Sequence, residues 1–441
     1  MQNLDMEYIC ILLLLSISII SYMYMPKIYN VSFLFSFFWC VILFLANLHC
    51  YDIYPPSTVA YCYITLGVVS YTVGFFIVMY RKSYCLSNIF DTEDNHISGQ
   101  RYVMIFLLCI VLLLPDLKMI YYFFNNGMDL HYIYYVVAMN SGGAVTEISD
   151  IQFGSGWQEI IQTYVGYTLQ YILIMGAICK ITYDHEKIYY IPMFALMIVR
   201  FLIDAKRTIL VMTFFNFIYM FILTKDMRNS DVKLENKVFS KKLLLYVSVF
   251  IASYIILSST RAGYDGDEFS IFKNFYFYYV GCVKYFDLRL ATFPDDISSY
   301  TFGLFALRGL LSPFLSFVTK VFEIEVPLYA NASKALESLH GTVMMIAPGH
   351  DYNSYATAFY EFYVDGGLVG ICVESCIFGC VSGYLLKRYL STHTLLSAMR
   401  LSFFISVYIL FSMLQISSII SYLVWSVVFC FILYKRKIDR V

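Results

Sequence analysis

The chain has 441 residues, of which 60% are hydrophobic and 14% are charged, and its mean hydropathy is +0.68. A soluble domain cannot bury that much apolar surface, so the composition excludes a soluble globular protein and predicts a polytopic membrane protein. The formal net charge of −1 gives no indication of a nucleic-acid partner, and the positions of the charges along the chain are more informative.

Runs of about 20 apolar residues predict membrane-spanning helices. The chain has eleven candidate runs, of which the fourth is interrupted by Pro115 and Asp116 and the sixth and seventh are short: 8–24, 32–50, 59–80, 101–120, 158–180, 188–203, 208–224, 243–260, 366–386, 397–414 and 418–434. We therefore expect an all-α polytopic integral membrane protein with about 11 transmembrane helices. The first run lacks the basic start and the cleavage site of a signal peptide, so we expect it to be retained.

Basic residues predict the orientation, because short cytoplasmic loops of membrane proteins are rich in Lys and Arg. With the amino terminus outside, the basic short loops, the stretch 225–242 and the basic tail all fall on the cytoplasmic side. The outer, periplasmic side then receives the segment 121–157 and a large loop, 261–365. The predicted organisation is thus eight helices in 1–260, the loop, and three helices with the basic tail in 366–441.

Two shorter patterns predict local packing. Cys372, Cys376 and Cys380 recur every four residues beside Gly379 and Gly383, which is typical of a close contact between two helices. Within the outer loop, the stretch TFGLFALRGLLSPFLSFVTKVF (301–322) has the amphipathic pattern of a helix that lies along a membrane surface.

Several cations break the positive-inside pattern at the outer ends of predicted helices. They are Arg200, Lys206, Arg207 and Arg261. One interpretation is that they extend towards lipid headgroups. The other is an anion site, because guanidinium groups bind phosphate oxygens in pairs and several cations together fit a pyrophosphate. Two further cations of the outer loop, Arg289 and Arg308, are candidates for the same site.

The tract from Asn353 to Gly370 reads N-x-x-x-T-A-F-Y-x-x-Y-x-D-G-G-x-x-G and leads into the ninth predicted helix. Together with the late outer loop and Arg261 in the motif STRAG, it resembles the Wzy-type O-antigen polymerases, which join oligosaccharide repeat units. The stretch from His350 to Asn353 is also similar to the His-Asn…Gly signature of O-antigen ligases, although two residues separate His from Asn here.

The resemblance implies a GT-C-like glycosyltransferase of the bacterial inner membrane, with its active site facing the periplasm. Its substrates would be oligosaccharides linked to undecaprenyl pyrophosphate, and the growing glycan would be transferred onto an incoming repeat unit. The product would be O-antigen, the polymer of lipopolysaccharide, or a related surface polysaccharide. The family implies no cofactor and no metal, and it implies a separate partner that regulates chain length.

This chemistry suggests roles for the candidate residues. The cations would neutralise the pyrophosphate leaving group, with Arg261 and His350 as the catalytic pair. A neutral His350 would take the proton of the acceptor hydroxyl, although Asp351, Glu361 and Asp365 are rivals for that role. The alternative for His350 is a structural position in a turn after Gly349, and Asn353 is a further loop candidate.

Two other functions remain open from the residues alone. A ligase would use the same donor and transfer the finished polymer to the lipid A-core. A flippase or transporter of lipid-linked oligosaccharides is a different class, and it usually shows inverted repeats and charges near the midplane of both halves, which this chain lacks.

Overall fold

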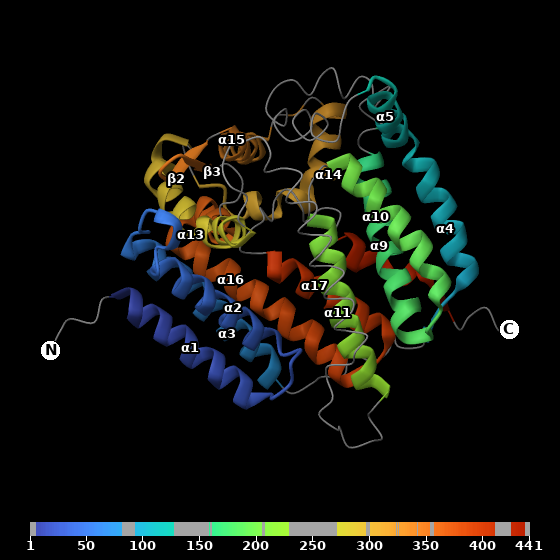
Figure 1. Ribbon diagram of the computed structural model, residues 1–441, viewed down its shortest axis with the longest axis horizontal. Coiled ribbons are helices and arrows are strands. Elements are labelled where there is room, and N and C mark those ends of the chain that lie inside the picture. Colours follow the sequence, from blue (N-terminus) through green and yellow to red (C-terminus); the bar gives the residue numbers. More distant parts are fainter. Residues whose placement is uncertain are drawn as a thin grey trace. The chain divides into compact units, whose positions relative to one another are not determined.

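Figure 1 shows the computed structural model of the chain. It describes residues 6–81, 93–127, 158, 161–204, 208–228, 271–296, 300–322, 324, 326–341, 343–352, 357–410 and 425–436. Outside them lie the predicted eighth span and four residues of the predicted site, namely Lys206, Arg207, Arg261 and Asn353. The chain forms two compact units. Unit 1 comprises 1–84, 272–391 and 407–421, and unit 2 comprises 85–271, 392–406 and 422–441.

The described residues are mostly helical, and several helices are long and apolar enough to cross a membrane. Five meet this test alone: α1 (Met6–Tyr24), α3 (Thr58–Tyr80), the helix Gln162–Asp184 that contains α9 (Tyr167–Cys179), α11 (Thr208–Arg228) and α16 (Ala358–Thr392). A sixth span is formed if α4 (Gly99–Leu112) and α5 (Leu114–Asn125), which meet at an angle of 53°, are counted together. The mostly helical fold is as predicted, and these long apolar helices are consistent with a membrane protein.

The number of eleven spans stays a prediction. Three further predicted spans appear as shorter helices, namely α2 (Val31–Asn47), α10 (Tyr190–Asp204) and α17 (Leu395–Leu410). At 1.5 Å per residue, the 17 residues of α2 extend about 25 Å, which is less than the hydrocarbon thickness of about 30 Å. The eighth predicted span and the first half of the eleventh lie outside the described residues.

In unit 1, α1, α2 and α3 pack against one another, and α3 packs on α16 (Figure 1). The α3–α16 contact is so close that backbone touches backbone. A Cβ on Gly74 would lie 2.0 Å from the carbonyl oxygen of Cys376, and a Cβ on Gly379 would lie 1.9 Å from that of Tyr71. Cys380 Sγ lies 3.3 Å from the carbonyl oxygen of Gly74. The predicted contact through small residues is therefore confirmed, and its partner is α3.

Helix α16 is broken near its start. Gly366 (φ −164°, ψ 27°) and Gly367 (φ 60°, ψ −141°) interrupt the helical backbone, and the second conformation is one that only glycine adopts readily. The sequence predicts a span that begins at Gly366. The helix in fact begins at Ala358, and the break divides it into a short first part and a long apolar part.

The described part of the segment 261–365, which the sequence predicts to be an outer loop, belongs to unit 1 from Phe272 onward. It forms three helices and a β-hairpin: α13 (Ile271–Asp296), α14 (Leu304–Phe322), α15 (Pro327–Gly341), β2 (Met344–Ala347) and β3 (His350–Tyr352). The hairpin packs on α13, since Gly281 faces Ile346 and Tyr352 and the Tyr352 hydroxyl donates to the Tyr278 carbonyl. The all-α prediction misses this hairpin and a second antiparallel pair in unit 2, β1 (Glu93–Ile97) with β4 (Tyr434–Arg436).

Unit 2 is built around α9, all of whose residues are buried. Helices α4, α10 and α11 pack against it. One π-helical turn precedes α9 (η3, Gln162–Gly166), a second follows it (η4, Lys180–Asp184), and a short 3₁₀ turn leads on (η5, Lys187–Tyr189). Gly166 lies against Leu112, where α4 ends and the bend towards α5 begins.

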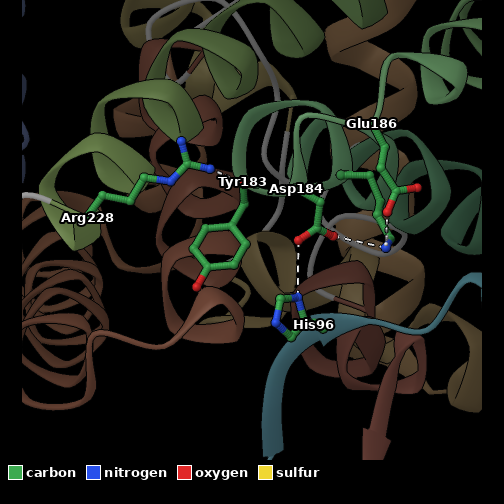
Figure 2. A network of polar contacts seen from close by, with 6 residues as sticks. His96, Tyr183, Asp184, Glu186 and Arg228 are labelled. Carbon is green, nitrogen blue, oxygen red and sulfur yellow. Dashed lines mark hydrogen bonds and ion pairs between the residues drawn. The ribbon is translucent and has the colours of Figure 1, made fainter.

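Several predicted cytoplasmic segments lie together at one end of unit 2. Lys180, whose side chain is 8% exposed, forms ion pairs with Asp184 at 2.9 Å and with Glu186 at 3.0 Å. His96 Nδ1 of β1 lies 3.1 Å from Asp184 Oδ1, as Figure 2 shows. The network thus links the loop after α9 to the β1–β4 pair.

The end of α11 and residues 430–436 join the same end of unit 2. Arg228 donates to the Tyr183 carbonyl (Figure 2). Its Nη1 also lies 2.6 Å from His185 Nε2. Arg101 donates to the Tyr434 carbonyl. The predicted grouping of basic segments is therefore present in unit 2, while the side of the membrane that this end faces stays a prediction.

Candidate functional site

Two arginines of the segment 261–365 reach the same helix in unit 1. Arg289 on α13 donates from Nη2 to Ser338 Oγ of α15 at 3.3 Å, and the Arg308 guanidinium on α14 lies 5.7 Å from the centroid of the Tyr329 ring of α15. Tyr329 and Ser338 are nine residues apart, which corresponds to about 13 Å along a helix. The structure therefore brings two of the six predicted pyrophosphate residues to opposite parts of one short helix.

Arg289 is covered on all sides, with 0% of the residue exposed. Its guanidinium lies 5.5 Å from the centroid of the Tyr360 ring on α16. A buried guanidinium is costly unless its surroundings are polar or aromatic. In this conformation Arg289 joins α13, α15 and α16, and a ligand has no direct access to it.

Arg308 is different because it is only partly covered. It stacks against Tyr329, and its Nε is buried without a hydrogen-bond partner among the described residues, where it also forms no ion pair. Its hydrogen-bonding capacity is therefore largely unused. Of the two arginines, Arg308 is the one that an anionic ligand can contact.

Asp365 fixes the helix that carries Arg308. Its Oδ1 accepts from the Thr301 hydroxyl and, at 2.8 Å, from the amide of Phe305, and its Oδ2 accepts from the amide of Ala306 at 2.8 Å. The first amides of a helix have no partner within the helix, and a carboxylate there also interacts favourably with the helix dipole. Asp365, on α16, thus caps α14. A carboxylate that accepts three hydrogen bonds is poorly placed to act as a base.

Two other carboxyl groups lie on α16 near this cap. Glu361 is completely buried. Glu374 has its carboxyl group beside that of Asp365, and its Oε2 has no hydrogen-bond partner among the described residues. Sequence reasoning missed Glu374, although an acidic residue inside an apolar run is a recognised signal of a functional position.

His350 lies apart from Arg289. It is the first residue of β3, follows the turn at Gly349 (φ 69°), and its ring centroid is 4.6 Å from that of Phe277 on α13. Phe277 and Arg289 are separated by about 18 Å along α13, from 12 residues at 1.5 Å each. The structure thus places His350 at the start of β3, directly after the hairpin turn, and the neighbouring Asp351 is exposed. The role of His350 as a base stays a prediction.

Arg200 belongs to unit 2 and is buried, with 3% of the residue exposed. Its guanidinium lies 3.7 Å from the centroid of the Tyr167 ring, and the Tyr167 hydroxyl donates to Asp116 Oδ1 at 3.2 Å. Gln162, in the π-turn before α9, is 2% exposed, and neither polar atom of its amide has a hydrogen-bond partner among the described residues. Tyr167 and Asp116 lie where α4 and α5 meet, and Arg200 is buried beside them rather than presented to solvent.

Within the described residues, no three His, Cys, Asp or Glu side chains are arranged to hold a metal ion. Comparisons of the chain with protein-family models, with curated proteins and with solved structures find no match. The resemblance to the Wzy-type polymerases therefore remains an expectation from the sequence.

Proposed function

We propose that the chain is a membrane glycosyltransferase that polymerises oligosaccharide repeat units linked to undecaprenyl pyrophosphate. The observation that carries the proposal is Arg308, a partly covered cation without an ion-pair partner among the described residues, on a helix capped by the Asp-Gly-Gly tract. In the proposed setting, the protein lies in a bacterial inner membrane and this part of unit 1 faces the periplasm.

The proposed reaction breaks the bond between the first sugar of the donor glycan and the pyrophosphate oxygen. A hydroxyl group of the incoming repeat unit attacks the same sugar carbon, forms the new glycosidic bond and gives its proton to a base. The pyrophosphate leaves with the bonding electron pair, and Arg308 stabilises the developing charge. His350 remains the proposed base, and Glu374 is its rival because its carboxyl group lies near the α14 cap.

The magnitude expected for Arg308 follows from its hydrogen bonds. A bond to a charged group contributes about 1.5–3 kcal/mol, and each 1.4 kcal/mol changes a rate about tenfold. We therefore expect Arg308→Met to lower the polymerisation rate by about 10- to 100-fold. Arg308→Lys keeps the charge but loses the paired geometry, so we expect it to retain part of the activity.

The test uses the purified full chain in proteoliposomes with a defined undecaprenyl-pyrophosphate repeat unit, and it measures the lengths of the products. The control is Arg388→Met, which removes an arginine from the other end of α16. A ladder of chain lengths that collapses in Arg308→Met but not in the control supports the proposal. No ladder from the unmodified protein refutes it.

Gene deletion separates the alternatives. Loss of a polymerase leaves surface glycan of a single repeat unit. Loss of a ligase leaves long polymer on the lipid carrier, and loss of a flippase removes surface glycan altogether.

A further inference from the structure

Helix α14 has an exposed apolar side that the described part of the protein does not cover. Leu307 is 49% exposed, Phe314 66%, Phe317 41% and Phe322 61%, and Phe302 just before the helix is 77% exposed. At 100° per residue, the four helical positions fall on one side of α14. Phe305, in the first turn, lies on the other side and is buried, and the buried Ala306 lies at the edge of the exposed side.

The exposed side is too large to be incidental. Large apolar side chains each carry about 150–250 Å², so these five expose on the order of 500 Å². Soluble surfaces rarely expose apolar patches above a few hundred Å² without a partner. Helix α15 packs on α14 and receives Arg308 against Tyr329, so it occupies a different side of the helix.

The start of α14 is bound to a defined point of a membrane-spanning helix. Asp365 accepts hydrogen bonds from Phe305 and Ala306, and Gly366 and Gly367 follow it. Immediately after this break, α16 presents its own exposed apolar residues, with Val369 70% and Val373 51% exposed. The exposed apolar side of the span and that of α14 therefore begin at the same place.

From this continuity we infer that α14 lies along the membrane surface, with Leu307, Phe314 and Phe322 in the boundary between headgroups and acyl chains of the outer leaflet. Arg308 borders the apolar side, as expected for a cation that extends towards headgroup phosphates. The occupant of this surface is thus a lipid bilayer. The inference stands independently of the proposed reaction, and it places Arg308 at the depth of lipid phosphates.

The experiment measures the depth of a probe on α14. p-Azidophenylalanine replaces Phe314, or Leu307 in a second variant. An environment-sensitive dye is attached to its azide by click chemistry. This labelling leaves the twelve cysteines of the chain unmodified. The full chain is placed in vesicles of phosphatidylethanolamine and phosphatidylglycerol. Quenchers are iodide in the water, a lipid with a spin label near its headgroup, and one with the label near the end of its acyl chain. Probes at Lys334, exposed on α15, and at Val373 on α16 serve as aqueous and deep references.

We expect the probes on α14 to lose fluorescence mainly with the shallow spin label and to emit at shorter wavelength than the Lys334 probe. Three results would overturn the inference. Quenching by iodide like that at Lys334 would place α14 in water. Quenching by the deep label like that at Val373 would make α14 a span. Protection from all three quenchers would mean that protein, either another copy or a partner, covers this side.

Discussion

The cap formed by Asp365 makes a prediction that can be worked out atom by atom. In Asp365→Asn, one carboxylate oxygen becomes an NH₂ group. The best orientation keeps Oδ1 on Thr301 and Phe305 and turns the NH₂ towards the amide of Ala306, which then loses its acceptor. An unsatisfied buried amide costs about 1–3 kcal/mol, and the lost charge at the helix start costs about 0.5–1 kcal/mol more.

We therefore expect Asp365→Asn to destabilise the first turn of α14 by about 3 kcal/mol. Since 1.4 kcal/mol corresponds to a factor of ten, amide hydrogen exchange at Phe305 and Ala306 is expected to become about 100-fold faster. Hydrogen-exchange mass spectrometry on the purified protein measures this directly. The matched control is Asp351→Asn, because Asp351 is exposed. If exchange at these two amides stays within a few-fold of the unmodified protein, Asp365 does not hold α14 as described.

Three other substitutions test the packing, each by thermal unfolding of the purified protein. Gly367→Ala is expected to lower the free energy of unfolding by about 1–3 kcal/mol, because the φ of Gly367 is 60°. The control Gly366→Ala should have little effect, because the space at its Cβ position is open. Gly379→Ala should cost about 1–3 kcal/mol, since its Cβ would collide with the Tyr71 carbonyl; a stability equal to that of Gly366→Ala would contradict the close helix contact. Lys180→Met leaves two carboxylates without their cation and should cost about 3 kcal/mol, and a neutral result would count against the network at this end of unit 2.

The fold was predictable from the sequence where local patterns decide it. Long apolar runs become helices wherever they occur, so α1, α3, α9 and α11 lie close to their predicted ranges. The small-residue spacing around Gly379 predicted a close contact, but its partner, α3, is some 300 residues away and leaves no local signal. The hairpin before α16 was missed because it is held by α13 and by the Tyr54 amide, which donates to the Ile346 carbonyl.

The candidate site was only partly predictable, because charge is visible in a sequence and burial is not. Arg308 and Asp365 were chosen for their chemistry, yet the capping of α14 by Asp365 joins residues about 60 positions apart. Arg200 was expected to present its charge on the outer face, but the fold encloses it beside Tyr167. Whether His350 or Arg261 acts in catalysis stays a prediction.

The touching backbones of α3 and α16 restrict how this sequence can diverge. Side chains that face lipid can be exchanged among apolar residue types. Most of the sequence of such a helix can therefore change during evolution without loss of the fold. A bulky side chain at position 74 or 379, however, would separate the two helices. We therefore expect distant homologues to keep small residues at these two positions even where the rest of the two helices has changed.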